Sequence, residues 1–211
     1  GDDTITYNNL SPNPLNYLWI QLDQNMRSKD SDTHLITTNS VGERMTISQL
    51  KRLNPDFDGG FKLDYIRDEN NKDLKHFINK TMMRVDLPEI LNTGETFTFS
   101  IKWWYNINDR MQIGGRSGYE YFEEDENYLY TIAQFFPRMC VYDDVEGWQN
   151  KQFLGRGEFA LPFGNYDVEI TVPADHLVSA TGTLTNEADI LTKDQKDRMK
   201  KAKTAFEQPI I

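Results

Sequence analysis

The chain has 211 residues, 38% of them hydrophobic and 27% charged, which predicts a globular protein of one domain, or one domain with an appendage. Its net charge of −10 argues against a nucleic-acid partner, because phosphate binding requires clustered Lys and Arg. The single cysteine, Cys140, excludes an internal disulfide. No apolar run approaches the ~18 residues of a membrane span.

The first half of the chain alternates between apolar and polar residues in several short segments. At 17–22 the alternation places Leu18, Ile20 and Leu22 on one face. A polar turn at 68–72 predicts a hairpin between its two flanking strands. The strands predicted in this half are 4–7, 17–22, 61–67, 74–78, 81–87 and 96–105. Between residues 23 and 60 the pattern is weak, and only a short helix at 45–53 is indicated.

The second half contains a dense aromatic run from Tyr119 to Trp148. The alternation within it predicts a strand at 127–134, which ends at Gln134 shortly before Pro137. Two further alternating segments, 166–172 and 177–183, predict strands as well. Thr192 and Gln195 then fit a capping box, so we expect a short helix to begin there. Many short strands between turns predict an all-β fold, an antiparallel sandwich or saddle-like sheet assembly with a short C-terminal helix.

Three segments carry a resemblance to a known family. They are YLYTIAQ-FFP-R followed by YDD (128–144), LPEILNTGETFTFSIKWWY (87–105) and RGEFALPFGNYDVEITVPADHLVSATGTL (156–184). In order and spacing they resemble the N-terminal β domain of zinc aminopeptidases of the aminopeptidase N and leukotriene hydrolase type. The resemblance extends over roughly residues 4–185 and is most consistent with a bacterial member.

The resemblance implies how the chain is divided. Residues 1–186 would be the N-terminal domain, and 187–211 a linker with a short helix that leads to a catalytic domain. That domain would follow Ile211, since the chain's first and last residues read as those of a piece. It would be the chain's partner, together with peptide substrates. An exported location, periplasmic or at the cell surface, is favoured for the parent.

The family's zinc-binding HEXXH motif is missing from this chain. The histidines, His34, His76 and His176, are far apart in sequence. The chain's own site therefore includes no metal ligands and no catalytic residue. Zinc would belong to the catalytic domain, and the chain alone is expected to lack peptidase activity.

One residue of the chain is expected to reach the substrate. In the family, a Gln or Glu at the end of the matching strand binds the free amine of the substrate's first residue, and the match places this role on Gln134. An amide carbonyl can accept a hydrogen bond from an ammonium group. The alternative is an ordinary polar residue at a strand end.

The other polar residues of the central stretch favour structural roles. Arg138 is expected to form a buried ion pair with Asp143 or Asp144 that braces the loop, in preference to a direct substrate role. Cys140 lies among apolar residues without a nearby histidine, so a small buried hydrophobe is predicted and not a nucleophile. The acidic run at 123–126 predicts a solvated hairpin tip in preference to a metal site.

Two further patterns suggest ligands. Asn54, Asp56 and Asp58 imitate the start of a calcium loop, but Tyr65 stands where the loop requires a Glu, so we do not expect calcium. The aromatic triplet 103–105 leaves open a second class of function. In it, Trp104 on the polar face of its strand would serve a free-standing binding module for carbohydrate or an extracellular protein, while Trp103 and Tyr105 pack in the core.

Overall fold

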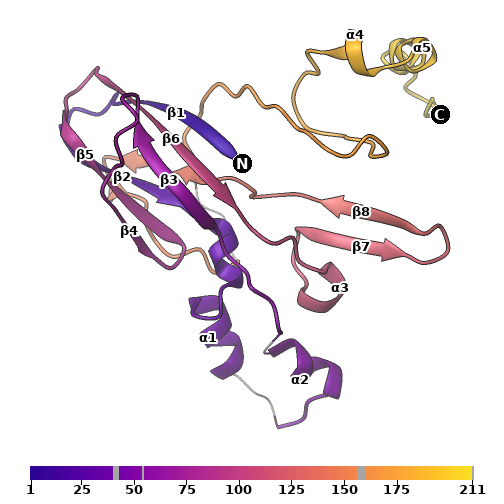
Figure 1. Ribbon diagram of the computed structural model, residues 1–211, viewed down its shortest axis with the longest axis horizontal. Helices are drawn as coiled ribbons and strands as arrows, with labels where there is room; N and C mark the ends of the chain where they lie inside the picture. The colour runs from indigo at the N-terminus through magenta and orange to yellow at the C-terminus, as the bar shows by residue number, and fades with distance from the viewer. Residues whose placement is uncertain (40–42, 54, 156–159, 211) are drawn as a thin grey trace. The chain divides into compact units, whose positions relative to one another are not determined.

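The computed structural model describes residues 1–39, 43–53, 55–155 and 160–210. They form two compact units, Gly1–Gly164 and Asn165–Ile211. Figure 1 shows that the strands gather in the first unit, while the second consists of irregular chain and short helices. The predicted all-β fold is confirmed, because the strands that build the first unit's sheets are antiparallel.

One sheet of the first unit contains three strands around the segment with the clearest alternation. β6 (Thr96–Trp104) lies at its centre, between β1 (Asp2–Asn8) and β3 (Lys62–Asp68). Both neighbours pair with β6 in antiparallel register. The prediction of strands at 4–7, 61–67 and 96–105 is therefore confirmed to within a few residues.

The second sheet contains four strands in the order β4-β5-β2-β9. Its members are β4 (His76–Asn79), β5 (Met82–Leu91), β2 (Leu15–Gln21) and β9 (Arg138–Met139). β9 adds to the edge of β2 through the pairs Ile20–Met139 and Gln21–Arg138. This pairing joins the centre of the chain to its beginning.

The predicted hairpin across 68–72 forms only at its turn. Asp68 N–H donates to the Lys72 carbonyl and Leu74 N–H to the Ile66 carbonyl, around an isolated bridge between Arg67 and Asp73. Beyond this turn the prediction is wrong, because β3 and β4 belong to different sheets. β4 pairs instead with β5, through a tight turn in which Lys80 is left-handed (φ 55°). The alternation identified both strands correctly, but it could not choose which neighbour each would pair with.

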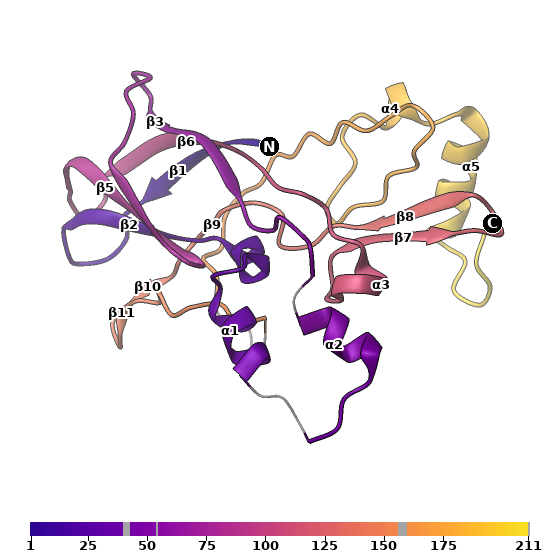
Figure 2. The ribbon, with the colours of Figure 1, turned by 60° about the horizontal axis from the view of Figure 1, so that its bottom comes forward.

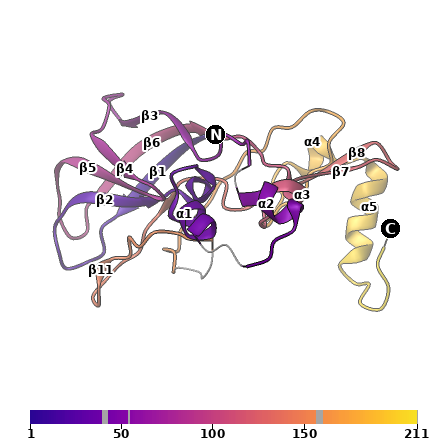
Figure 3. The same cartoon turned by 90° about the horizontal axis from the view of Figure 1, so that it is seen from below.

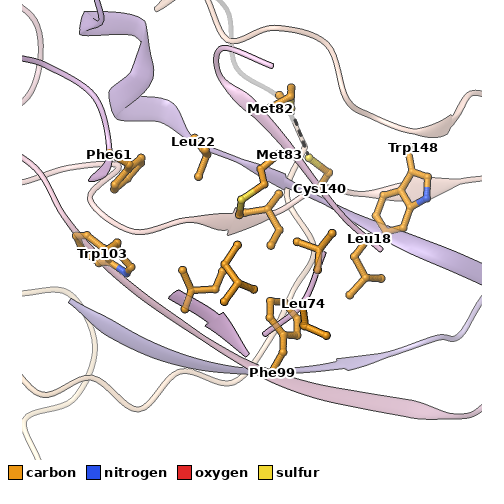
Figure 4. Packing of buried hydrophobic residues seen from close by; sticks show 14 of the residues in the cluster. Leu18, Leu22, Phe61, Leu74, Met82, Met83, Phe99, Trp103, Cys140 and Trp148 are labelled. Atoms are coloured by element: carbon orange, nitrogen blue, oxygen red, sulfur yellow. Dashed lines mark hydrogen bonds between the residues drawn. The ribbon is translucent and has the colours of Figure 1, made fainter. Parts of the chain in front are cut away.

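The core lies between the two sheets (Figure 4). Leu18, Ile20 and Leu22 are completely buried, as their alternation predicted. From the opposite sheet, β6 contributes Phe99 and Ile101, which are completely buried as well. At one end, the rings of Phe61 and Trp103 meet edge to face with their centroids 5.4 Å apart.

Short helices occupy the weakly patterned region after β2. α2 (Ile47–Leu53) confirms the helix predicted there, whereas the 3-10 helix η1 (Asp23–Arg27) and α1 (Asp32–Asn39) were not predicted. α1 contacts η1, and Figure 3 shows it between the sandwich and α2. The residues of η1 are mostly polar and yet buried, so no apolar period could reveal it.

A separate hairpin leads away from the sandwich within the first unit (Figure 2). It consists of β7 (Gly118–Phe122) and β8 (Asn127–Thr131), preceded by α3 (Arg110–Ile113). The acidic residues 123–126 form its exposed turn, which confirms the predicted hairpin tip. A small ribbon of β10 (Tyr142–Asp143) and β11 (Gly147–Trp148) completes the strands of this unit.

The second unit contains the predicted helix but not the predicted strands. α5 (Lys193–Ala202) follows α4 (Glu187–Ile190), and Thr192 caps it in a reciprocal box with Gln195. No strand is present at 166–172 or 177–183, both of which are described and exposed. The prediction of strands at these two segments is therefore wrong. Alternation marks which side chains would share a face, but a strand also requires hydrogen-bond partners, and a lone hairpin is marginal in water.

Candidate functional site

Gln134 lies three residues beyond the end of β8, not within a strand as predicted. Its backbone is left-handed, with φ 53°, which is uncommon for a residue with a side chain. The left-handed conformation makes a turn after β8, directly before Phe135. The ring of Phe135 packs on Trp103, with 6.5 Å between their centroids, and so anchors the turn to the core.

Two buried side chains hold the backbone around Gln134. The Gln24 Nε2 amide of η1 donates to the carbonyl oxygens of Ala133 (3.1 Å) and Gln134 (2.9 Å). The hydroxyl of Ser117, just before β7, donates to the Thr131 carbonyl and accepts from the Ala133 N–H. The turn is thus fixed from two sides, because each contact satisfies a backbone group that the strand no longer pairs.

The side-chain amide of Gln134 is not used by these contacts. It is half-buried, and among the described residues it has no hydrogen-bond partner. An amide offers two donors and an acceptor with two lone pairs. A rigid turn that presents an unused amide is a suitable place for a polar ligand group.

Arg138 forms the predicted buried ion pair, but with Asp23 and not with Asp143 or Asp144. Its Nε and Nη2 lie 2.8 and 2.7 Å from the two carboxylate oxygens of Asp23. The Asp23 carboxylate also accepts from the Gln21 Nε2 at 2.6 Å, and its side chain is only 1% exposed. The sequence suggested a local partner, whereas the pairing of β9 with β2 provides a partner 115 residues away.

Asp143 instead shapes the turn between β10 and β11. Its carboxylate accepts hydrogen bonds from the backbone N–H groups of Val145 and Glu146 and from the Gln149 amide. These hydrogen bonds, above all that from Glu146, lower the pKa of Asp143 below its usual value. Asp144 is exposed.

Cys140 is the buried hydrophobe that the sequence predicted, with 2% of its surface exposed. Its Sγ lies 3.9 Å from the Met82 sulfur (Figure 4). Burial raises the pKa of the thiol to about 12, so it remains protonated at neutral pH. A nucleophilic role would require the thiolate.

The exposed aromatic residues gather on the β7–β8 hairpin more than at Trp104. Trp104 is 48% exposed, while Trp103 and Tyr105 pack on Phe61, as predicted. Direct cross-strand pairing places four tyrosines on one face of the hairpin, which we call the tyrosine face: Tyr119, Tyr121, Tyr128 and Tyr130. The tyrosine face was not predicted from the sequence. Its signal was alternation on both arms of the hairpin around the acidic turn.

The sequence offered two weak metal patterns, the calcium-like loop at 54–58 and the acidic run at 123–126, and neither was expected to bind a metal. Within the ranges that the structure describes, no group of three or more His, Cys, Asp or Glu side chains could hold a metal ion. Of the calcium-like loop, Asn54 lies outside those ranges, and Asp58 forms an ion pair with Lys62 at 2.8 Å. The described helices include none with the length and apolarity required to cross a membrane.

Two open grooves in the first unit lie apart from Gln134. The larger, of about 580 Å³, is bordered by α2, α3 and Tyr119, and the smaller, of about 370 Å³, by residues 28–30 and 56–59 with Lys62. Figure 2 shows α2 and α3, which border the larger groove, next to each other. Both are shallow, and neither is lined by Gln134.

Comparison of the chain with protein-family models, with curated proteins and with solved structures found no match in any of the three.

Proposed function

We propose that this chain is the non-catalytic N-terminal β domain of a zinc metalloaminopeptidase. In this function it walls one side of the substrate cleft and offers Gln134 to the free amine of the peptide. The zinc ion and the catalytic residues belong to a catalytic domain elsewhere in the parent protein. The proposal begins from the three sequence segments that resemble this family.

One structural observation supports the role of Gln134 most directly. Its backbone is held by Gln24 and Ser117, yet its amide forms no hydrogen bond within the described chain. Catalytic efficiency benefits when a binding group is held in place before the substrate arrives. An amide oxygen on a fixed turn can accept from a substrate ammonium without first leaving another partner.

Kinetics of the whole parent protein test the proposal. Replacement of Gln134 by Ala should weaken transition-state binding by ~1–3 kcal/mol, because a charged group loses its hydrogen bond. That corresponds to a loss of roughly 5- to 150-fold in kcat/KM for peptides with a free amine. Gln134→Glu should retain most activity, since its carboxylate still accepts. Gln112→Ala, a change of the same type on the exposed α3, is the matched control.

Two results would contradict the proposal. If the parent protein shows no zinc-dependent release of N-terminal residues, the aminopeptidase assignment is wrong. If that activity is present but kcat/KM is the same in Gln134→Ala and Gln112→Ala, Gln134 does not bind the amine. The pure 211-residue chain should show neither stoichiometric zinc nor hydrolysis.

A second candidate, a binding module for carbohydrate or an extracellular partner, is favoured by the tyrosine face. Tyr121 and Tyr128 are 49% and 56% exposed, with ring centroids 4.8 Å apart. Flat aromatic surfaces of this kind have a large apolar area and a polar edge, which suits a sugar ring. A glycan array should then give a hit that Tyr121→Ala or Tyr128→Ala removes. Loss of the hit in Trp104→Ala alone would place binding at Trp104.

A further inference from the structure

Arg27 ends η1 with its guanidinium partly covered by protein, between Gln24 and Gly115. Its Nη1 donates to the Oε1 of Gln24 at 2.6 Å, and the residue is only partly exposed. A Cβ added at Gly115 would lie 2.8 Å from Nη2, and φ at Gly115 is +97°. A glycine at this position leaves the space that the guanidinium occupies.

Among the described residues, no anionic group pairs with Arg27. Within the described ranges, no carboxylate oxygen lies within 4 Å of the guanidinium, and its hydrogen bond is to the neutral amide of Gln24. Burial lowers the pKa of Arg27, and the nearby Tyr105 opposes this only in part. An arginine has five N–H donors and remains charged in proteins, so most of its capacity is unused.

Arg138, which pairs with Asp23 at the start of η1, shows what a compensated arginine looks like in this protein. Its guanidinium donates to both carboxylate oxygens of Asp23, and the Gln21 amide donates to one of them. That carboxylate pairs with Arg138 and forms no ion pair with Arg27. A desolvated charge without a counter-ion is costly to fold, and its cost falls when an anion binds.

We propose that Arg27 is a binding site for a carboxylate that comes from outside the described chain. Carboxylates match the planar fork of a guanidinium and bind it in two parallel hydrogen bonds. The amide of Gln24 connects this site to the Gln134 turn, since its oxygen accepts from Arg27 and its nitrogen donates to the Gln134 carbonyl. The inference does not depend on the aminopeptidase proposal, because it rests on Arg27 alone.

NMR of the arginine Nε–H groups in the 211-residue chain tests the site. Sodium acetate is titrated at constant ionic strength against sodium chloride. We expect the Arg27 signal to move and saturate, while Arg138 stays in place because Asp23 occupies its fork. Arg198, on the exposed surface of α5, reports non-specific screening and should shift weakly and without saturation. The proposal is wrong if Arg27 follows Arg198, or if its signal does not move.

Variants and peptides complete the test. Arg27→Lys keeps the charge but loses the fork, so saturation should weaken at least several-fold. Acetate should raise the melting temperature of the unaltered chain because it binds the folded state, and Arg27→Gln should abolish this rise. If these variants fail to fold, the titration of the unaltered chain still decides.

An amidated peptide with a central Glu should saturate the Arg27 signal at lower concentration than acetate if the carboxylate belongs to a peptide. The same peptide with Gln in place of Glu should have no effect. Saturation by acetate but not by the Glu peptide assigns the carboxylate to a neighbouring protein surface.

Discussion

The ion pair between Arg138 and Asp23 allows the sharpest test of how this fold is held together. Replacing Arg138 by Met removes two charge-assisted hydrogen bonds of 2.8 and 2.7 Å and leaves the carboxylate, whose side chain is 1% exposed, with Gln21 as its remaining partner. Each such bond is worth about 1.5–3 kcal/mol. The free energy of unfolding should therefore fall by about 3–5 kcal/mol, the range for an orphaned buried charge.

Urea unfolding followed by tryptophan fluorescence measures this loss. The matched control is Arg84→Met, which breaks the Arg84–Asp86 pair on the surface, where the side chains are 43% and 32% exposed. That change should cost about 1–2 kcal/mol, because it also removes the contact of the Arg84 guanidinium with the Tyr17 ring, whose centroid is 4.1 Å away. A double replacement, Arg138→Met with Asp23→Leu, should recover most of the stability because no charge remains buried. If Arg138→Met costs no more than Arg84→Met, the buried pair is not what joins β9 to β2.

Three further predictions concern other contacts. Asn25→Ala should lower the free energy of unfolding in urea by about 2–3 kcal/mol. The Asn25 amide accepts from the Phe61 N–H and donates to the Lys80 carbonyl, both at 2.7 Å, and the change leaves both groups unpaired. A cost below that of Arg84→Met would contradict this. Burial raises the pKa of Cys140 from 9.0 to about 12, so the unfolded chain loses the thiol proton at a lower pH than the folded chain. The free energy of unfolding should therefore fall by about 1.4 kcal/mol per pH unit between pH 9 and 12, and this contribution should be absent in Cys140→Ala. Thr192→Ala should reduce the helicity of α5 in circular dichroism, at a cost of about 1 kcal/mol, since it removes the cap on Gln195.

Much of the sandwich could be predicted from short-range patterns. The alternation around Leu18 and Ile20 correctly gave both the strand and its buried face. The capping box at Thr192 likewise located a helix start, because capping depends on residues three positions apart. Segments 166–172 and 177–183 show the limit of such patterns, since their alternation is as regular but no strand forms.

The candidate site could be predicted only in part. The sequence singled out Gln134 but placed it in a strand, because alternation continues through Ile132 and gives no sign of the left-handed turn that follows. Gln24, which holds that turn, is 110 residues away and lies in a buried polar helix without an apolar period. Arg27 was missed for the same reason.

The sequence by itself determined the local elements of this protein: which segments alternate, which face of each is apolar, and where α5 begins. Only the tertiary structure decided the partners, such as Asp23 for Arg138 and β5 for β4. The physical reason is that alternation and capping depend on neighbours within a few residues, whereas pairing depends on which distant segment provides matching hydrogen bonds and charge. The environments of Gln134 and Arg27 arise from such distant contacts.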